Sequence, residues 1–85
     1  MKYSFYIESD YKDGEESDYV CDASPEWVEL HVRDFCKHLY HERDGWEWMK
    51  DSSERVVIVG EDESVRYFNF ELEYEPTFFT LEVKQ

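Results

Sequence analysis

The feature that most constrains the fold is an alternation of apolar, mostly aromatic, side chains near both ends of the chain. Two segments, residues 2–8 and residues 65–75, carry an apolar residue at every second position. These positions are Tyr3, Phe5 and Ile7 in the first segment and Phe68, Phe70, Leu72 and Tyr74 in the second. Because successive side chains of a strand point to opposite faces, each segment is expected to be a strand with one buried face.

Further strand signals follow the middle of the chain. Residues 56–59 form a β-branched run that ends at Gly60, and residues 51–54 and 61–64 are polar turns. Two more segments show alternation, one with Trp46, Trp48 and Lys50 and one with Phe79, Leu81 and Val83. Pro76 interrupts the pattern, because proline cannot donate a ladder hydrogen bond. The second half of the chain is therefore predicted to be an antiparallel meander.

A single long helix is predicted over residues 25–43. Ser24 suits the N-cap, Pro25 suits the first helical position, and Glu26 complements the positive end of the helix dipole. Gly45 suits the stop. The apolar stripe, at spacings of three and four, consists of Val28, Val32, Phe35, Cys36 and Leu39. The expected fold is α+β in two layers, with one helix packed on an antiparallel sheet of four or five strands and one domain spanning residues 1–85.

Residues 9–22 are predicted to form a loop. This segment is rich in Asp and Glu and contains Gly14. Tyr11, Tyr19 and Val20 are the side chains expected to fold back and order it.

The acidic balance limits the function classes. The chain has 22 Asp and Glu residues against 9 Lys and Arg, a formal net charge of −13. Such a surface cannot bind nucleic acid directly, because neutralising phosphates requires Lys and Arg, and it is equally unsuited to anionic lipid. No apolar run approaches the roughly 20 residues that span a membrane, and Glu8 and Asp10 come too early for a signal peptide. We expect a soluble cytoplasmic protein.

The predicted strand at residues 65–75 places acidic side chains in a row on its outer face. Neighbouring carboxylates in the row Glu71, Glu73 and Glu75 are about 6.6–6.8 Å apart on one face. DNA places a charge about every 3.4 Å along one strand, so the row matches every second phosphate. Other carboxylates that can extend this surface are Glu82 and the turn residues Glu61, Asp62 and Glu63. The row therefore suggests mimicry of a polyanion, although Glu also serves simply to solvate an exposed sheet face.

The helix has a second face, which carries large apolar and titratable side chains. Its members are Trp27, His31, Asp34, His38 and His41, with Leu30 at the edge. An exposed Trp on this face is a candidate interface anchor. In the alternative arrangement the acidic loop covers Trp27. Three His on a helix suggest zinc, but their spacing matches no metal motif, so no metal site is expected.

No catalytic fingerprint is found in the sequence. Cys36 belongs to the core stripe, and neither Cys21 nor Cys36 is expected to form a disulfide in a reducing compartment. The chain contains no nucleophile elbow, phosphate-binding glycine loop or zinc-protease motif. We expect a protein that is not an enzyme and has no cofactor.

In size, charge and expected α+β fold, the chain resembles small acidic DNA-mimic inhibitors such as phage anti-CRISPR proteins, with no shared motif. The resemblance implies a basic nucleic-acid-binding partner, such as a CRISPR effector or a nuclease, in the cytoplasm of a bacterial host. It also implies a monomer or a small homo-oligomer. Immunity proteins against nuclease toxins are similar at the same level, and here Trp27, His31 and Asp34 would form the contact. The third interpretation is an accessory domain whose acidity serves solubility alone.

The charge imbalance leads to a first prediction. Like charges repel one another in the compact state, so moderate salt should screen this repulsion and raise the melting temperature. Thermal unfolding followed by circular dichroism in low salt and at about 0.2 M NaCl tests this. A melting temperature that falls on adding salt would contradict self-repulsion.

Overall fold

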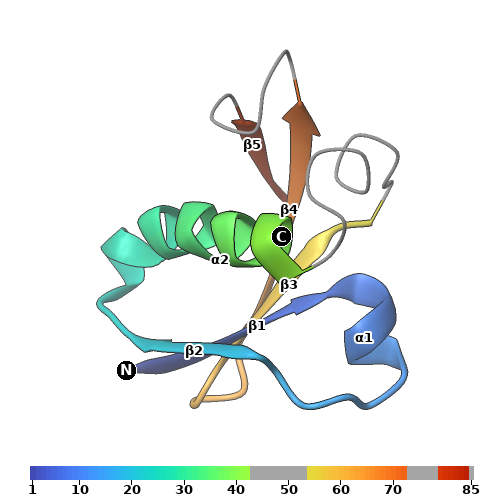
Figure 1. Ribbon diagram of the computed structural model, residues 1–85. Helices are drawn as coiled ribbons and strands as arrows, with labels where there is room; N and C mark the ends of the chain where they lie inside the picture. Colours follow the sequence, from blue (N-terminus) through green and yellow to red (C-terminus); the bar gives the residue numbers. More distant parts are fainter. Residues whose placement is uncertain (43–53, 73–78, 85) are drawn as a thin grey trace.

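The computed structural model of the protein describes residues 1–42, 54–72 and 79–84 (Figure 1). Its elements in chain order are β1 (Lys2–Ile7), α1 (Glu8–Lys12), β2 (Tyr19–Asp22), the 3-10 helix η1 (Pro25–Trp27), α2 (Val28–Glu42), β3 (Val56–Gly60), β4 (Val65–Leu72) and β5 (Phe79–Lys84). Several predicted features lie outside the described residues, namely the strand with Trp46, Trp48 and Lys50, the stop at Gly45, residues 51–53 of a turn, and Tyr74 and Pro76.

The strands form one five-stranded sheet with the order β2-β1-β3-β4-β5, and every neighbouring pair is antiparallel. The predicted meander is confirmed for β3, β4 and β5. β1 lies between β2 and β3, so these two strands run parallel to each other and α2 connects them across one face of the sheet (Figure 1). The two-layer α+β prediction is therefore confirmed.

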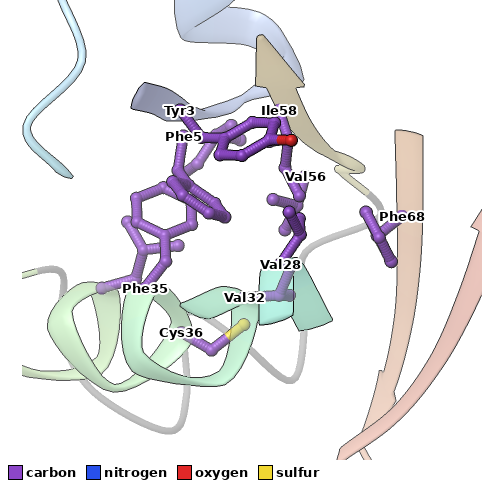
Figure 2. Close-up of a cluster of buried hydrophobic side chains, with 11 residues drawn as sticks. Tyr3, Phe5, Val28, Val32, Phe35, Cys36, Val56, Ile58 and Phe68 are labelled. Atoms are coloured by element: carbon purple, nitrogen blue, oxygen red, sulfur yellow. The ribbon is translucent and has the colours of Figure 1, made fainter. Parts of the chain in front are cut away.

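The hydrophobic core lies between α2 and the inner face of the sheet. All five residues of the predicted helix stripe are buried, and they pack against alternate residues of three strands. The strand residues of this core are Tyr3, Phe5, Ile7, Val56, Ile58 and Phe68. Figure 2 shows Phe5 of β1 and Phe35 of α2 facing each other between the sheet and the helix. Their ring centroids are 5.8 Å apart. Within the described residues no charged side chain is buried, so the acidic groups remain in contact with water.

The helix begins differently from the prediction. Residues 25–27 form a 3-10 turn, and Ser24 makes no side-chain capping bond to the backbone. Ser24 instead contributes to lowering the pKa of the Glu26 carboxyl. The helix itself reaches Glu42, the last residue described before the gap.

The prediction of a loop over residues 9–22 is wrong. The segment contains most of α1 and all of β2, which is an edge strand paired with β1 in the register Tyr3↔Cys21. The local sequence does not show these elements, because residues far away in the chain stabilise them. The Glu8 amide donates to the Arg55 carbonyl (2.9 Å) and the Ser9 amide to Glu54 Oε2 (2.9 Å).

One serine hydroxyl joins β2 to β1. Ser17 Oγ accepts hydrogen bonds from the amides of Phe5 and Tyr19, each at 3.1 Å. The same oxygen lies 2.5 Å from the Phe5 carbonyl and 2.6 Å from the Tyr19 carbonyl, and its single proton can be donated to either. The Tyr19 ring then packs edge-on against Phe5 at 5.3 Å. Tyr19 thus orders the segment as the sequence suggests, whereas Val20 remains exposed.

An ion pair holds α1 against the start of β3. Arg55 Nε donates to Glu8 Oε2 at 2.7 Å, and Arg55 Nη2 contacts the same oxygen. Lys12 Nζ lies 3.5 Å from Glu8 Oε1. The hydrogen bond from Arg55 lowers the pKa of the Glu8 carboxyl below its ordinary value, because it favours the charged form.

Two leucines of α2 provide a matched test of the core. Leu39 is 2% exposed and Leu30 is 49% exposed. Leu39→Ala should lower the free energy of unfolding by about 2–5 kcal/mol, because it leaves a cavity, whereas Leu30→Ala should change it by about 0.5 kcal/mol or less. Urea unfolding of the two variants measures both effects, and equal losses would contradict the observed packing of α2.

The Glu8–Arg55 contact predicts a pH dependence. A lowered carboxyl pKa contributes stability that is fully present above the ordinary value of 4.5 and is lost as the pH falls through the lowered pKa. The wild type should therefore melt above Glu8→Gln near pH 6, and this difference should shrink towards about pH 3. The control is Glu29→Gln, which makes the same charge change at an exposed position of α2. A Glu8→Gln difference independent of pH would show that the ion pair contributes nothing.

Candidate protein-binding surface

The predicted site residues Glu61, Asp62 and Glu63 form the turn between β3 and β4, and all three are exposed. The turn has a defined conformation. Asp62 Oδ1 accepts hydrogen bonds from the Ser64 amide (3.1 Å) and hydroxyl (2.6 Å), which lower the pKa of Asp62. Glu63 has a φ of 69°, in the left-handed region. Asp62 therefore has a structural role as well as a charge.

This turn lies at the same end of the sheet as the start of α2. The Glu61 amide donates to the Lys2 carbonyl (2.9 Å), and Lys2 pairs with Asp22 of β2. From β4, Arg66 Nη1 reaches the Pro25 carbonyl of η1 (3.4 Å). Five exposed acidic residues thus gather here, and we call them the acidic end: Asp22, Glu26, Glu61, Asp62 and Glu63.

Three carboxylates of the acidic end, those of Asp22, Glu26 and Asp62, have pKa values below their ordinary ones. A hydrogen bond from the α-amino group of Met1, 2.9 Å from Asp22 Oδ1, lowers the pKa of Asp22. Hydrogen bonds from its own backbone amide and from Ser24 lower the pKa of Glu26. Among the residues described, Glu61 and Glu63 form no ion pair within 4 Å, and both side chains are exposed to solvent.

The predicted acidic row is described only in part. Glu71 pairs with Thr80 and Glu82 pairs with Asn69, so Glu71 and Glu82 occupy diagonal positions on one face of the β4–β5 ladder. Glu73 and Glu75 lie outside the described residues. Glu71 is six residues along β4 from Val65, roughly 20 Å from the turn. The structure therefore separates this row from the acidic end.

Two large apolar side chains are exposed at the start of the helical segment. Trp27 is 58% exposed and Leu30 is 49% exposed. The alternative that the acidic loop covers Trp27 is wrong, because residues 19–22 pair with β1 instead. Asp34, a predicted contact residue on the same helix, is exposed as well. Trp27 directly follows Glu26 in η1, so one predicted anchor is a chain neighbour of a residue of the acidic end.

Two of the three histidines, His31 and His38, do not share this exposed face, whereas His41 is exposed. His31 and His38 are half-buried where α2 meets β2, and the sequence missed this contact because it did not predict β2. His31 Nδ1 lies 3.5 Å from the Tyr19 hydroxyl and 4.0 Å from Asp34 Oδ2. The His38 ring stacks on Phe35. Within residues 1–42, 54–72 and 79–84, no three His, Cys, Asp or Glu side chains are placed to hold a metal ion.

The cysteines have the environments expected of structural residues. Cys36 is buried in the core, and burial raises the pKa of its thiol to about 12. Its thiolate, which is the nucleophilic form, is therefore scarce at neutral pH. Cys21 is half-buried in β2, and burial raises its thiol pKa as well.

Comparison with known proteins finds no relative, since no protein-family model, curated protein or solved structure matches the chain. In the part of the chain that the structure describes, no helix is long and apolar enough to cross a membrane. The indication of function therefore has to come from the surface itself.

Proposed function

We propose that this protein is a small acidic inhibitor that binds a basic nucleic-acid-handling protein, with its carboxylates occupying the positions of nucleic-acid phosphates. The observation that carries the proposal is the acidic end. Carboxylates from the β2–η1 connection and from the β3–β4 turn gather at one end of the sheet, beside the exposed Trp27. A basic groove that normally holds phosphates offers the complementary charge.

The few cations near the acidic end leave it strongly negative. In the part of the chain that the structure describes, the positive groups here are the α-amino group of Met1, Lys2 and Arg66, against five carboxylates. Arg66 is also bound to the Pro25 carbonyl. Such an imbalance costs stability through repulsion, and it speeds association with an oppositely charged partner. A binding role explains why the protein tolerates this loss of stability, whereas solubility alone does not require the charges to gather at one end.

A second candidate function is immunity towards one nuclease toxin, and the exposed Trp27 favours it. Tryptophan is enriched among residues that dominate binding energy, especially where a large ring fills a pocket of the partner. With Leu30 and Asp34 it forms a contact on the helical side of the molecule. This candidate predicts a tight, weakly salt-dependent complex in which Trp27→Ala causes the main loss.

The proposal predicts a loss of binding when the turn charges are removed. Glu61→Gln with Glu63→Gln removes two charges without touching Asp62, whose hydrogen bonds shape the turn. The association rate constant with the partner should fall by about ten-fold in low salt and by less near physiological salt. The matched control is Glu15→Gln with Glu16→Gln, which removes the same charge from exposed positions in the segment between α1 and β2.

The partner is found by capture from a bacterial lysate at low salt, followed by competition. Short duplex DNA should release the captured protein, whereas an uncharged polymer at the same concentration should not. A triple variant tests the predicted acidic row in the same assay; it combines Glu71→Gln, Glu73→Gln and Glu75→Gln. Retention in the presence of DNA, or equal losses for the turn variant and its control, would contradict phosphate mimicry. Capture of no partner at all would favour an accessory domain.

A further inference from the structure

The strand β2 is four residues long and lies at an edge of the sheet. Among residues 1–42, 54–72 and 79–84 it pairs with β1 alone. Val20 is 55% exposed and the Asp22 side chain is 73% exposed. A strand in this position presents a row of backbone donors and acceptors that an added strand can use.

The hydrogen bonds at both ends of β2 show which backbone groups point outwards. The Ala23 amide donates to the Met1 carbonyl (2.9 Å), and Ser17 Oγ links the amides of Phe5 and Tyr19. Backbone groups along an antiparallel strand alternate between its two sides. Residues 19, 21 and 23 therefore face β1, whereas the N–H and C=O groups of Val20 and Asp22 face away from the sheet.

The side chains beside these free groups alternate between acidic and apolar. Val20 and Asp22 lie on the face of the sheet opposite α2, Asp18 directly precedes the strand, and all three are exposed. The ladder register continues Val20 into a row with Ser4, Val59 and Val65. A strand added beside β2 would therefore meet Val20 and Asp22 on this face, and it would pass Asp18 where it extends beyond the start of β2.

We propose that the β2 edge binds an extended, basic segment of the partner protein, which pairs with Val20 and Asp22 as an additional strand. The matching segment carries an apolar residue opposite Val20 and Lys or Arg two positions to either side of it, opposite Asp18 and Asp22. Opposite charges at directly paired strand positions stabilise a sheet. This inference rests on the proposed function, because it assumes a basic partner, and it adds the way in which that partner is held.

A second copy of this chain is a poorer occupant of the same edge. When two β2 strands pair, Asp18 and Asp22 of one copy come close to the same two aspartates of the other copy. Like charges at paired positions destabilise a sheet. Each copy also carries a formal net charge of −13, so the approach itself is repulsive. The charge pattern of the edge thus favours a cationic strand.

Synthetic peptides test the pairing without a purified partner. The probe peptide contains the sequence Lys-Thr-Val-Thr-Lys, and its control has the same composition in the order Lys-Lys-Val-Thr-Thr. The probe should bind more tightly, by about ten-fold. It should also protect the amides of Val20 and Asp22 from hydrogen exchange, measured by NMR on the intact protein. Equal affinity for the two peptides, or no protection of these amides, would overturn the inference.

A backbone variant tests the same edge from the side of the protein. Val20→Pro removes an N–H that faces away from β1, a position at which edge strands tolerate proline. It should weaken binding of the probe peptide by about ten-fold, whereas Val20→Thr, which keeps the N–H and the β-branched shape, should bind nearly as well as the wild type. The exchange measurement on the wild type remains decisive if Val20→Pro does not fold.

The remaining outcomes separate this inference from its alternatives. In the absence of peptide, protection of the Val20 amide from hydrogen exchange that grows with protein concentration would show that a second copy of the chain occupies the edge. That result would overturn the proposal. Release of the captured partner by duplex DNA, together with no peptide-induced protection, overturns only the edge pairing. Protection without competition by DNA supports the edge and contradicts phosphate mimicry instead.

Discussion

The structure depends on the burial of one face of α2 against β1, β3 and β4. Phe5 and Phe35 meet at the centre of this contact, and Tyr19 joins them from the edge strand, with its ring 5.9 Å from that of Phe35. Each aromatic ring removes a large apolar area from water. This burial has to offset both the chain entropy and the mutual repulsion of an unbalanced acidic surface. Among the described residues no charged group enters the core, so the two opposing effects occupy separate parts of the molecule.

Because the charged groups stay outside the core, the surface has three distinct features. Charge gathers at the acidic end, apolar exposure is largest at Trp27 and Leu30, and the β2 edge combines free backbone groups with alternating Asp and Val side chains. The β2 edge, Trp27 and Leu30 are close to one another in the chain, and the β3–β4 turn, which is distant in the chain, reaches the same end of the sheet. A single partner that covers this side of the molecule can use electrostatic attraction to approach, an aromatic anchor for affinity and strand pairing for orientation.

The sequence predicted the elements whose hydrophobic pattern is strong. The alternation around Phe5 and Phe68 and the stripe through Val32 identified strands and a helix correctly, because burial of one face imposes a period that is visible locally. The site was predicted less completely. Glu61, Asp62, Glu63 and Asp34 are exposed as expected, and the exposure of Trp27 decides between the two arrangements that the sequence left open. His31 and His38 contact Tyr19 of β2, a strand that the sequence of residues 9–22 did not reveal.

The sequence alone determined the fold class, the identity of the core stripe and the excess of negative charge, since these follow from periodicity and composition. Only the tertiary structure decided which acidic residues become neighbours and which strand is left at the edge. The contacts that decide this join residues distant in the chain, such as Ser17 with Phe5, Arg55 with Glu8 and Arg66 with Pro25. A hydrogen bond made by a side chain leaves no periodic pattern in a sequence, so only the tertiary structure determines the position of β2.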